Sequence, residues 1–279
     1  MGRLLLTLLV LLAMVAAPAR ASVLLNGAGA TFPFPLYSKW VAEFSKHDPD
    51  IHINYQPIGS GGGIGQIIAG TVDFGATDGP MTDEQLAALR VPVLHLPTAL
   101  GAVVITFKVN HIDRLRFDPE TLAGIFLGKI TNWKDAAIRR STSMPLPDAP
   151  ITVVHRADGS GTSYVFTDYL SKVSPEWQAT VGRGTDVRWP VGLSGTGNEG
   201  VADLVQHTEN SIGYVELIYS VQHDLPYAGI RNRAGNFVLP TLESVNAAAA
   251  VVATDMPHDF RVSITDPSGQ DAYPISSFT

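Results

Sequence analysis

Three glycine-rich loops that contain serine or threonine each come directly before a predicted helix. They span residues 27–33 (GAGATFP), 59–63 (GSGGG) and 158–162 (DGSGT). Glycine lets the backbone approach a ligand closely, and serine and threonine add hydroxyl donors. The unpaired N–H groups of a helix's first turn, with the helix dipole, attract an anion without net positive charge. Any one loop is more simply explained as a turn that caps its helix, but three in one chain favour an anion site.

Arg156 and Asp158 place two charged groups beside the third loop, at the end of a predicted strand. The guanidinium of Arg156 is suited to fork onto an oxyanion while Asp158 holds its other face. The alternative is an ordinary surface ion pair, which contributes about 0–1 kcal/mol.

Asp78 follows a predicted hydrophobic strand in the segment 72–80 (VDFGATDGP), at the carboxyl edge where ligands of open α/β sheets bind. A carboxylate suits an anion that still carries a proton. Phosphate near neutral pH keeps at least one proton and sulfate keeps none, so Asp78 would accept a hydrogen bond from phosphate alone. A site built around a ligand's hydroxyl rejects the analogue that lacks it by about 10⁴ to 10⁵. The alternative is a helix N-cap or turn aspartate.

Composition limits the classes of function. The chain has 279 residues, 45% of them hydrophobic, and no cysteine, which fits a globular core and excludes disulfides, thiolate metal sites and a lipid-modified cysteine. The formal net charge of −7 becomes −9 without residues 1–21, which hold Arg3 and Arg20 but no acidic residue. Such a charge argues against nucleic acid, and it requires an anion site to rely on local dipoles and hydrogen bonds.

Residues 1–21 are predicted to be a signal peptide. Arg3 provides a short basic region, residues 4–17 form an apolar stretch, and Ala19 and Ala21 supply a small-x-small cleavage pattern. The apolar stretch is shorter than the roughly 20 residues that span a bilayer. A buried N-terminal helix is the alternative. We therefore expect an exported protein that is not embedded in a membrane.

The remaining sequence alternates strand-like and helix-like segments, which predicts α/β architecture. Residues 141–149, rich in proline and serine, are interpreted as a surface excursion. The segment 82–90 is predicted to be a helix that a Thr82–Gln85 capping box opens. Strands are expected at 51–55, 72–76, 91–96, 102–109, 151–155 and 211–217, and further helices at 36–44, 63–69, 118–126, 160–173 and 200–207.

These segments resemble the periplasmic phosphate-binding protein of the phosphate-specific ABC transporter, the PstS family. The resemblance covers residues 24–276, nearly all of the exported chain, in order and spacing. The matching strings are 27–33 with Tyr37, Lys39 and Trp40; 55–56 and 58–63 (IGSGGG); 67–78 (IIAGTVDFGATD); 127–133 (LGKITNW); 156–163 (RADGSGTS); 189–200 (WPVGLSGTGNEG); and 212–216 (IGYVE).

The resemblance implies a type II periplasmic binding protein fold: two α/β lobes joined by two crossing strands, with the ligand in the cleft. It implies a first lobe at 22–97, a second at 98–270 and a return crossover at 271–279. Arg156 would be the only cationic contact, oriented by Asp158. The implied phosphate ligands are Thr31, Phe32 (through its backbone N–H), Ser60, Asp78, Arg156, Asp158, Ser160, Gly161 and Thr162.

The chain departs from this family pattern at its C-terminal end. The resemblance implies roughly 60 further residues of strand and helix after the crossover, and the sequence stops at Thr279. Relative to the family the chain is C-terminally truncated, so we expect the first lobe to expose apolar surface and a sheet edge. A non-functional remnant is one alternative that follows.

Other motifs were weighed against this interpretation. Residues 195–200 match GxGxxG before a helix, which indicates a dinucleotide site or, more simply, a packing turn. Ser160 with nearby His155 would suit an exported phosphatase or esterase, but GSG is not a GxSxG elbow. The eight histidines form no metal motif.

The sequence therefore predicts an exported, periplasmic, monomeric solute-binding protein without a lipid anchor. It would bind inorganic phosphate, deliver it to the permease subunits of an ABC transporter by lobe closure, and use no cofactor or metal. We do not expect an enzyme.

Overall fold

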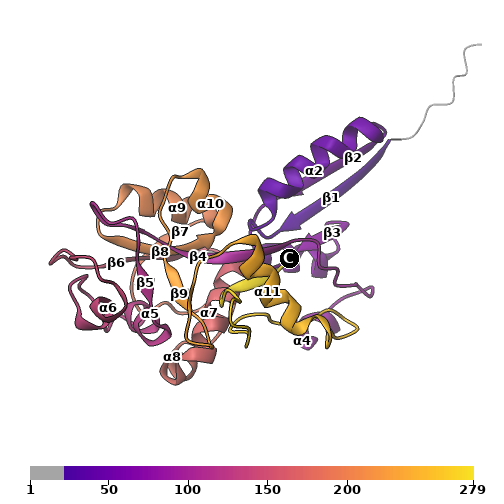
Figure 1. Ribbon diagram of the computed structural model, residues 1–279. Helices are drawn as coiled ribbons and strands as arrows, with labels where there is room; N and C mark the ends of the chain where they lie inside the picture. The colour runs from indigo at the N-terminus through magenta and orange to yellow at the C-terminus, as the bar shows by residue number, and fades with distance from the viewer. Residues whose placement is uncertain (1–21) are drawn as a thin grey trace, which may run out of the picture.

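The computed structural model describes residues 22–279, and Figure 1 shows their arrangement. The predicted signal peptide lies outside the described residues. The described chain is α/β, with two separate groups of strands and helices around two main sheets, as the sequence predicts.

The first lobe is built on a parallel sheet of β1 (Val23–Gly29), β2 (Ile51–Gln56) and β3 (Phe74–Ala76), in the order β2-β1-β3. Side chains along β2 alternate between half-buried and exposed, which is the period-2 pattern that predicted this strand. The lobe also contains α2 (Phe34–His47), α3 (Ser60–Ala69) and α4 (Asp83–Ala87). The predicted Thr82–Gln85 capping box is present, although α4 ends earlier than predicted.

The second lobe contains a mixed five-stranded sheet in the order β11-β4-β8-β6-β7. β6 is parallel to β7 and β8, whereas β4 is antiparallel to β8 and β11. A small sheet orders β10-β9-β5. The strands are β4 (Leu100–Lys108), β5 (Arg116–Phe117), β6 (Thr152–Arg156), β7 (Leu193–Gly195), β8 (Ser211–Glu216), β9 (Gly229–Arg231), β10 (Phe237–Val238) and β11 (Ser276–Phe278).

Helices pack beside these sheets and close the core. α9 lies against β6 and β8, and α7 against α5 and β8. The helices are α5 (Pro119–Phe126), α6 (Ala136–Ser141), α7 (Gly161–Val173), α8 (Pro175–Thr180), α9 (Gly197–His207), α10 (Leu217–Gln222) and α11 (Leu242–Ala253). The division at residues 22–97, 98–270 and 271–279 stays a prediction.

An aromatic cluster in the second lobe packs against β6 and α7, which carry several of the predicted ligands. The ring centroid of Phe166 lies 4.7 Å from that of Phe126 and 4.6 Å from that of Tyr214. The Tyr214 hydroxyl accepts a hydrogen bond from the backbone N–H of Arg156 at 3.1 Å and lies 2.6 Å from Ser163 Oγ. The apolar core thereby fixes both the end of β6 and the first turn of α7.

The strand predicted at residues 91–96 is wrong. This segment forms no regular element, because Pro92 and Pro97 bound it and proline removes a ladder donor. Its apolar side chains are instead turned outward, with Leu94 86% exposed.

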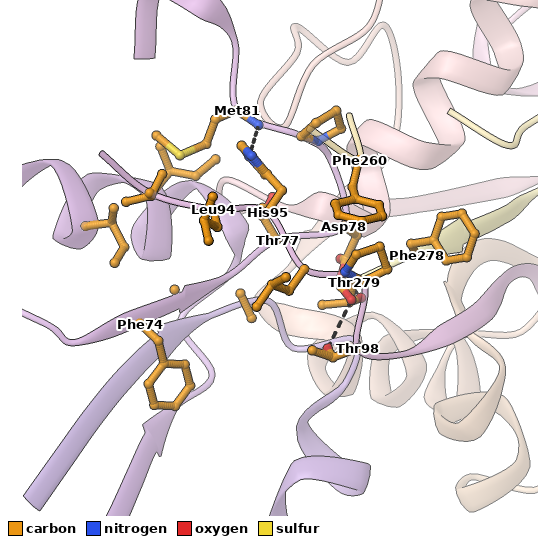
Figure 2. Close-up of a pocket in the computed structure, with 18 of the residues that line it drawn as sticks. Phe74, Thr77, Asp78, Met81, Leu94, His95, Thr98, Phe260, Phe278 and Thr279 are labelled. Carbon is orange, nitrogen blue, oxygen red and sulfur yellow. Dashed lines mark hydrogen bonds between the residues drawn. The ribbon is translucent and has the colours of Figure 1, made fainter. Parts of the chain in front are cut away.

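An apolar groove of about 520 Å³ lies between this segment and β3. β3 is an edge strand of its sheet, and Val91, Leu94 and Leu96 beside it are exposed. Figure 2 shows Leu94 and His95 in the groove wall, with Asp78 and Thr279 next to each other. Its lining is mostly apolar, which does not suit an anion.

No helix within residues 22–279 is long and apolar enough to cross a bilayer.

Candidate functional site

The candidate site lies where two parallel strands of the first lobe and one strand of the second lobe end and three loops meet. β1 leads into Thr31 and Phe32, β3 into Asp78, and β6 ends at Arg156. Ser60 opens α3, and Ser160 caps α7. Except for the half-buried Asp158, all the predicted ligands are buried: Thr31, Phe32, Ser60, Asp78, Arg156, Ser160, Gly161 and Thr162.

The loops approach each other so closely that only glycine fits between them. A Cβ atom on Gly161 would lie 2.2 Å from Ser60 Oγ and 2.3 Å from Asp78 Oδ2. The backbone N–H of Gly61 donates to the carbonyl oxygen of Gly159 at 2.8 Å. The first turn of α7 therefore lies directly against the side chains of Ser60 and Asp78, and the loops at residues 59–63 and 158–162 meet the segment that carries Asp78.

Arg156 and Asp158 form a two-pronged ion pair. Arg156 Nε donates to Asp158 Oδ1 at 2.8 Å, and Nη2 donates to Oδ2. The side chain of Arg156 is 1% exposed, so the alternative of a surface ion pair is wrong. Burial alone would raise the pKa of Asp158, but its bonds to Arg156 hold that pKa below the usual value. A third Arg156 contact, from Nη1 to Thr162 Oγ1, is 3.4 Å long, which leaves N–H groups for a ligand.

The carboxylate of Asp78 has one occupied oxygen and one free oxygen. Oδ1 accepts a hydrogen bond from Thr279 Oγ1 at 2.6 Å. Oδ2 is buried and has no hydrogen-bond partner among the described residues. Burial raises the pKa of Asp78 to about 7, although Thr279 and Arg156 act to lower it. The N-cap alternative is wrong, because Thr82 caps the helix that follows.

Each of the two serine hydroxyls of the site accepts a hydrogen bond from a backbone N–H group. Ser60 Oγ accepts from the backbone N–H of Asp78 at 3.3 Å. Ser160 Oγ accepts from the backbone N–H of Ser163 at 3.0 Å. A hydroxyl that accepts from the protein keeps its own proton for a ligand. Each serine hydroxyl therefore has a proton that neither of these bonds uses.

Sequence reasoning missed three side chains that support these loops. Asn198 and Tyr219 both bond Thr31, through its hydroxyl and its carbonyl oxygen respectively, and Thr279 bonds Asp78. For Asn198, the available signal was its place at the start of a helix inside the matching string 189–200. For Tyr219 and Thr279 no local pattern existed, since their partners are 188 and 201 residues away.

The glycines of residues 195–200 form a packing turn. A Cβ on Gly195 would lie 2.7 Å from the carbonyl carbon of Gly200, so glycine lets β7 end directly against α9. The first N–H of this helix, on Gly197, donates to Asp158 Oδ1 at 2.9 Å. The helix terminus that a dinucleotide would need is thus already used inside the protein.

Among residues 22–279, no base is shown in hydrogen-bond contact with Ser160 Oγ, as a hydrolase nucleophile would need. Its hydroxyl caps α7, while His155 Nδ1 lies 3.0 Å from the carbonyl oxygen of Arg156. The His155 ring stacks on Trp189 with centroids 5.0 Å apart. Within residues 22–279, no three His, Cys, Asp or Glu side chains are grouped to hold a metal ion.

From the two buried carboxyls of Asp78 and Glu216 we predict how the stability of the ligand-free protein changes with pH. Burial raises the pKa of Asp78 to about 7 and that of Glu216 to about 8. Unfolded carboxyls titrate near pH 4, so between about pH 8.5 and 7 the folded state binds more protons than the unfolded state. The free energy of unfolding therefore rises as the pH falls through this range. The increase is at most about 1.4 kcal/mol per pH unit for each carboxyl.

Thermal unfolding without phosphate at pH 8.5 and pH 7 measures this effect, with a higher midpoint expected at pH 7. The variant Asp78→Asn with Glu216→Gln serves as the control and is expected to flatten the difference. The range stops at pH 7 because His95 and His155, whose pKa values burial lowers, act in the opposite direction at lower pH. A midpoint that falls from pH 8.5 to pH 7 contradicts the assignment.

Comparison with known proteins places the chain in a family. A family model described as a PBP superfamily domain matches residues 16–279. The phosphate-binding protein PstS of Xylella fastidiosa is 46% identical over 259 residues, which cover 92% of this chain and 70% of that protein. The phosphate-binding protein PstS of Pasteurella multocida is also 46% identical, over 91% of this chain and 74% of that protein.

Solved structures share the fold at lower identity. A human phosphate binding apolipoprotein superposes with a TM-score of 0.69 at 20% identity, over 91% of this chain and 79% of that chain. An ABC-type phosphate transport receptor from Vibrio cholerae superposes with a TM-score of 0.55 at 18% identity, over 91% of this chain and 84% of that one. These likenesses confirm the two-lobed fold that the sequence predicted.

Proposed function

The chain belongs to the PstS family of phosphate-binding proteins, and from that premise we propose that it binds inorganic phosphate between its lobes for delivery to an ABC transporter. The observation that carries this proposal is Asp78 Oδ2, a buried acceptor without a partner, which faces the first turn of α7. A buried polar atom left unpaired costs free energy unless a ligand satisfies it.

The groups around Asp78 suit the other oxygens of a tetrahedral anion. Arg156 keeps N–H donors beyond those that bond Asp158, and the N-terminus of α7 presents unpaired amides and the positive end of its dipole. The proposed ligands are those predicted from the sequence: Thr31, Phe32 through its N–H, Ser60, Asp78, Arg156, Asp158, Ser160, Gly161 and Thr162.

Both oxygens of Asp158 already accept bonds from the protein, so Asp78 Oδ2 is the acceptor that can select for a protonated anion. Phosphate can donate its remaining proton to Asp78 Oδ2 while its other oxygens accept from the loops. Sulfate has no proton to give, so one of its oxygens would face a carboxylate. Burial raises the pKa of Asp78 to about 7, so the ionised carboxylate that would reject sulfate dominates above that pH, and selectivity should be measured there.

The proposal describes a transport component rather than an enzyme. The chain is exported by residues 1–21, acts as a periplasmic monomer, and passes phosphate to the permease subunits of the transporter. Closure of the two lobes over the ligand provides the conformational signal for that transfer.

Isothermal titration of the purified exported chain with phosphate tests the proposal. We expect one phosphate bound per chain and no detectable hydrolysis of phosphate esters. The matched variant Ser160→Ala should weaken phosphate binding, because it removes a ligand hydroxyl. Ester turnover that Ser160→Ala abolishes while phosphate binding persists would instead support the hydrolase alternative. A folded chain that binds no phosphate at millimolar concentration contradicts the proposal.

A further inference from the structure

We propose that Asn198 is a positioning residue that fixes the hydroxyls of Thr31 and Thr162 as donors toward the bound anion, an inference that rests on the proposed function. Asn198 lies in the first turn of α9 and is fully buried. Its Nδ2 donates to Thr31 Oγ1 at 2.8 Å and to Thr162 Oγ1 at 3.1 Å. One amide group thus bonds a hydroxyl from each side of the cleft.

The orientation of the Asn198 amide is fixed by a contact on its other side. Asn198 Oδ1 accepts the backbone N–H of Glu216 at 2.9 Å, at the end of β8. If the amide were flipped, its NH₂ group would face the backbone N–H of Glu216, and two donors would oppose each other. The amide oxygen would then face the threonines and could not donate to them. The nitrogen therefore faces the threonines because the main chain of β8 holds the oxygen.

This orientation decides which way the threonine protons point. A hydroxyl has one proton and can accept two hydrogen bonds. Thr31 Oγ1 accepts from the backbone N–H of Asn198 at 3.4 Å as well as from its Nδ2. Thr162 Oγ1 accepts from Arg156 Nη1 at 3.4 Å as well as from Asn198 Nδ2. With their acceptor sides facing protein donors, both hydroxyls keep their protons for a ligand.

Together with Ser60 and Ser160, this makes every hydroxyl of the proposed ligand set a donor. Asp78 Oδ2 is then the acceptor that an anion's own proton meets. Asn198 touches no ligand in this arrangement. It acts through Thr31 and Thr162, and it thereby helps to set the donor pattern on which selectivity for a singly protonated oxyanion depends.

The variant Asn198→Asp tests this role because aspartate has nearly the same shape but no N–H donors. The threonine protons would turn toward the introduced carboxylate, which also adds a negative charge beside the anion. At pH 8 we expect phosphate affinity to fall at least about 100-fold, since two hydrogen bonds to a charged ligand are lost. The charged and titratable residues joined to Asn198 or its bonding partners are Arg156, Asp158, Glu216 and Tyr219.

Two readouts separate positioning from a merely structural role. The affinity ratio between wild type and Asn198→Asp should shrink from pH 8 to pH 6, because a buried carboxyl regains its proton and with it a donor. In addition, Thr162→Val should weaken binding in the wild type but change little in the Asn198→Asp background, since the threonine no longer donates to phosphate there.

Asn232→Asp is the matched control. Asn232 is also buried, and its Nδ2 donates to backbone carbonyls, including that of Gln270 at 2.7 Å. This control should lower the unfolding midpoint while the folded fraction binds phosphate with wild-type affinity. If it does not fold, Asn236→Asp replaces it, as the exposed Asn236 donates to the same carbonyl at 3.1 Å.

The outcomes distinguish this inference from the proposed function. The inference alone would be overturned if the wild type binds phosphate and the phosphate affinity of Asn198→Asp at pH 8 is within threefold of the wild-type affinity. An equal cost of Thr162→Val in both backgrounds would also overturn it. Folded wild type that binds no phosphate would overturn the proposed function and the inference together.

Discussion

Replacing Asp78 with asparagine is expected to remove most of the discrimination between phosphate and sulfate. In the wild type, sulfate would place an unprotonated oxygen against Asp78 Oδ2, the buried oxygen without a partner. Sites that depend on a ligand's hydroxyl discriminate by about 10⁴ to 10⁵. An asparagine amide can turn an N–H toward either anion, so the ratio of the two affinities should fall to about 10 or less.

Competition titrations of phosphate and sulfate against both proteins measure this ratio. Asp73→Asn is the matched control, because Asp73 lies in the same segment and its carboxylate accepts the Asn26 N–H at 2.8 Å, at an exposed position. This control should keep the wild-type ratio. Unchanged selectivity in Asp78→Asn would count against the role of Asp78 as proton acceptor.

Replacing Arg156 with alanine is expected to cause the largest loss of affinity. Arg156 is the proposed cationic contact of a site in a chain of net negative charge, and its removal also leaves Asp158 unpaired beside the anion. Removing one partner of a buried ion pair leaves an uncompensated charge, which is strongly destabilising. We expect phosphate binding to weaken at least about 1000-fold, since a charge-assisted bond is lost and a like charge is exposed to the ligand.

Arg156→Lys separates charge from geometry. Lysine keeps the charge but cannot donate to both oxygens of Asp158 and to a ligand in one plane, so we expect affinity between those of alanine and wild type. Arg183→Ala is the control, because Arg183 pairs with Asp168 while its own side chain is 60% exposed. Calorimetry on variants whose folding is confirmed by unfolding midpoints gives the answer. Full affinity in Arg156→Ala would contradict the proposed ligand set.

Much of the site could be predicted because its chemistry is local in the sequence. Each loop carries its glycine and hydroxyl residues within a few positions of a helix start, and Arg156 and Asp158 are two residues apart. Hydrophobic strands before Asp78 and Arg156 place both at a carboxyl edge. Where the residues that make a feature are neighbours in sequence, composition and periodicity are enough to find it.

The supporting contacts could not be predicted, because they join distant segments. Asn198 meets Thr31 across 167 residues, and Thr279 meets Asp78 across 201. Only the tertiary fold brings these pairs together. The wrong strand at residues 91–96 has a related cause, since an alternating pattern becomes a strand only where a neighbouring strand can pair with it.

The groove beside β3 is lined by Asp78 and Thr279 as well as by apolar side chains, so it adjoins one of the proposed ligands. The chain covers 70% of the length of the Xylella fastidiosa relative, and Leu94 and Leu96 are 86% and 66% exposed. The proposed ligands nevertheless all lie within residues 31–162, inside the described part of the chain.

A crystal structure of the exported chain with phosphate bound tests the central claim most directly. We predict the anion between the lobes, with one oxygen within hydrogen-bond distance of Asp78 Oδ2 and others facing Arg156 and the first turn of α7. Phosphate bound elsewhere, with Asp78 Oδ2 still lacking a partner, would contradict the account.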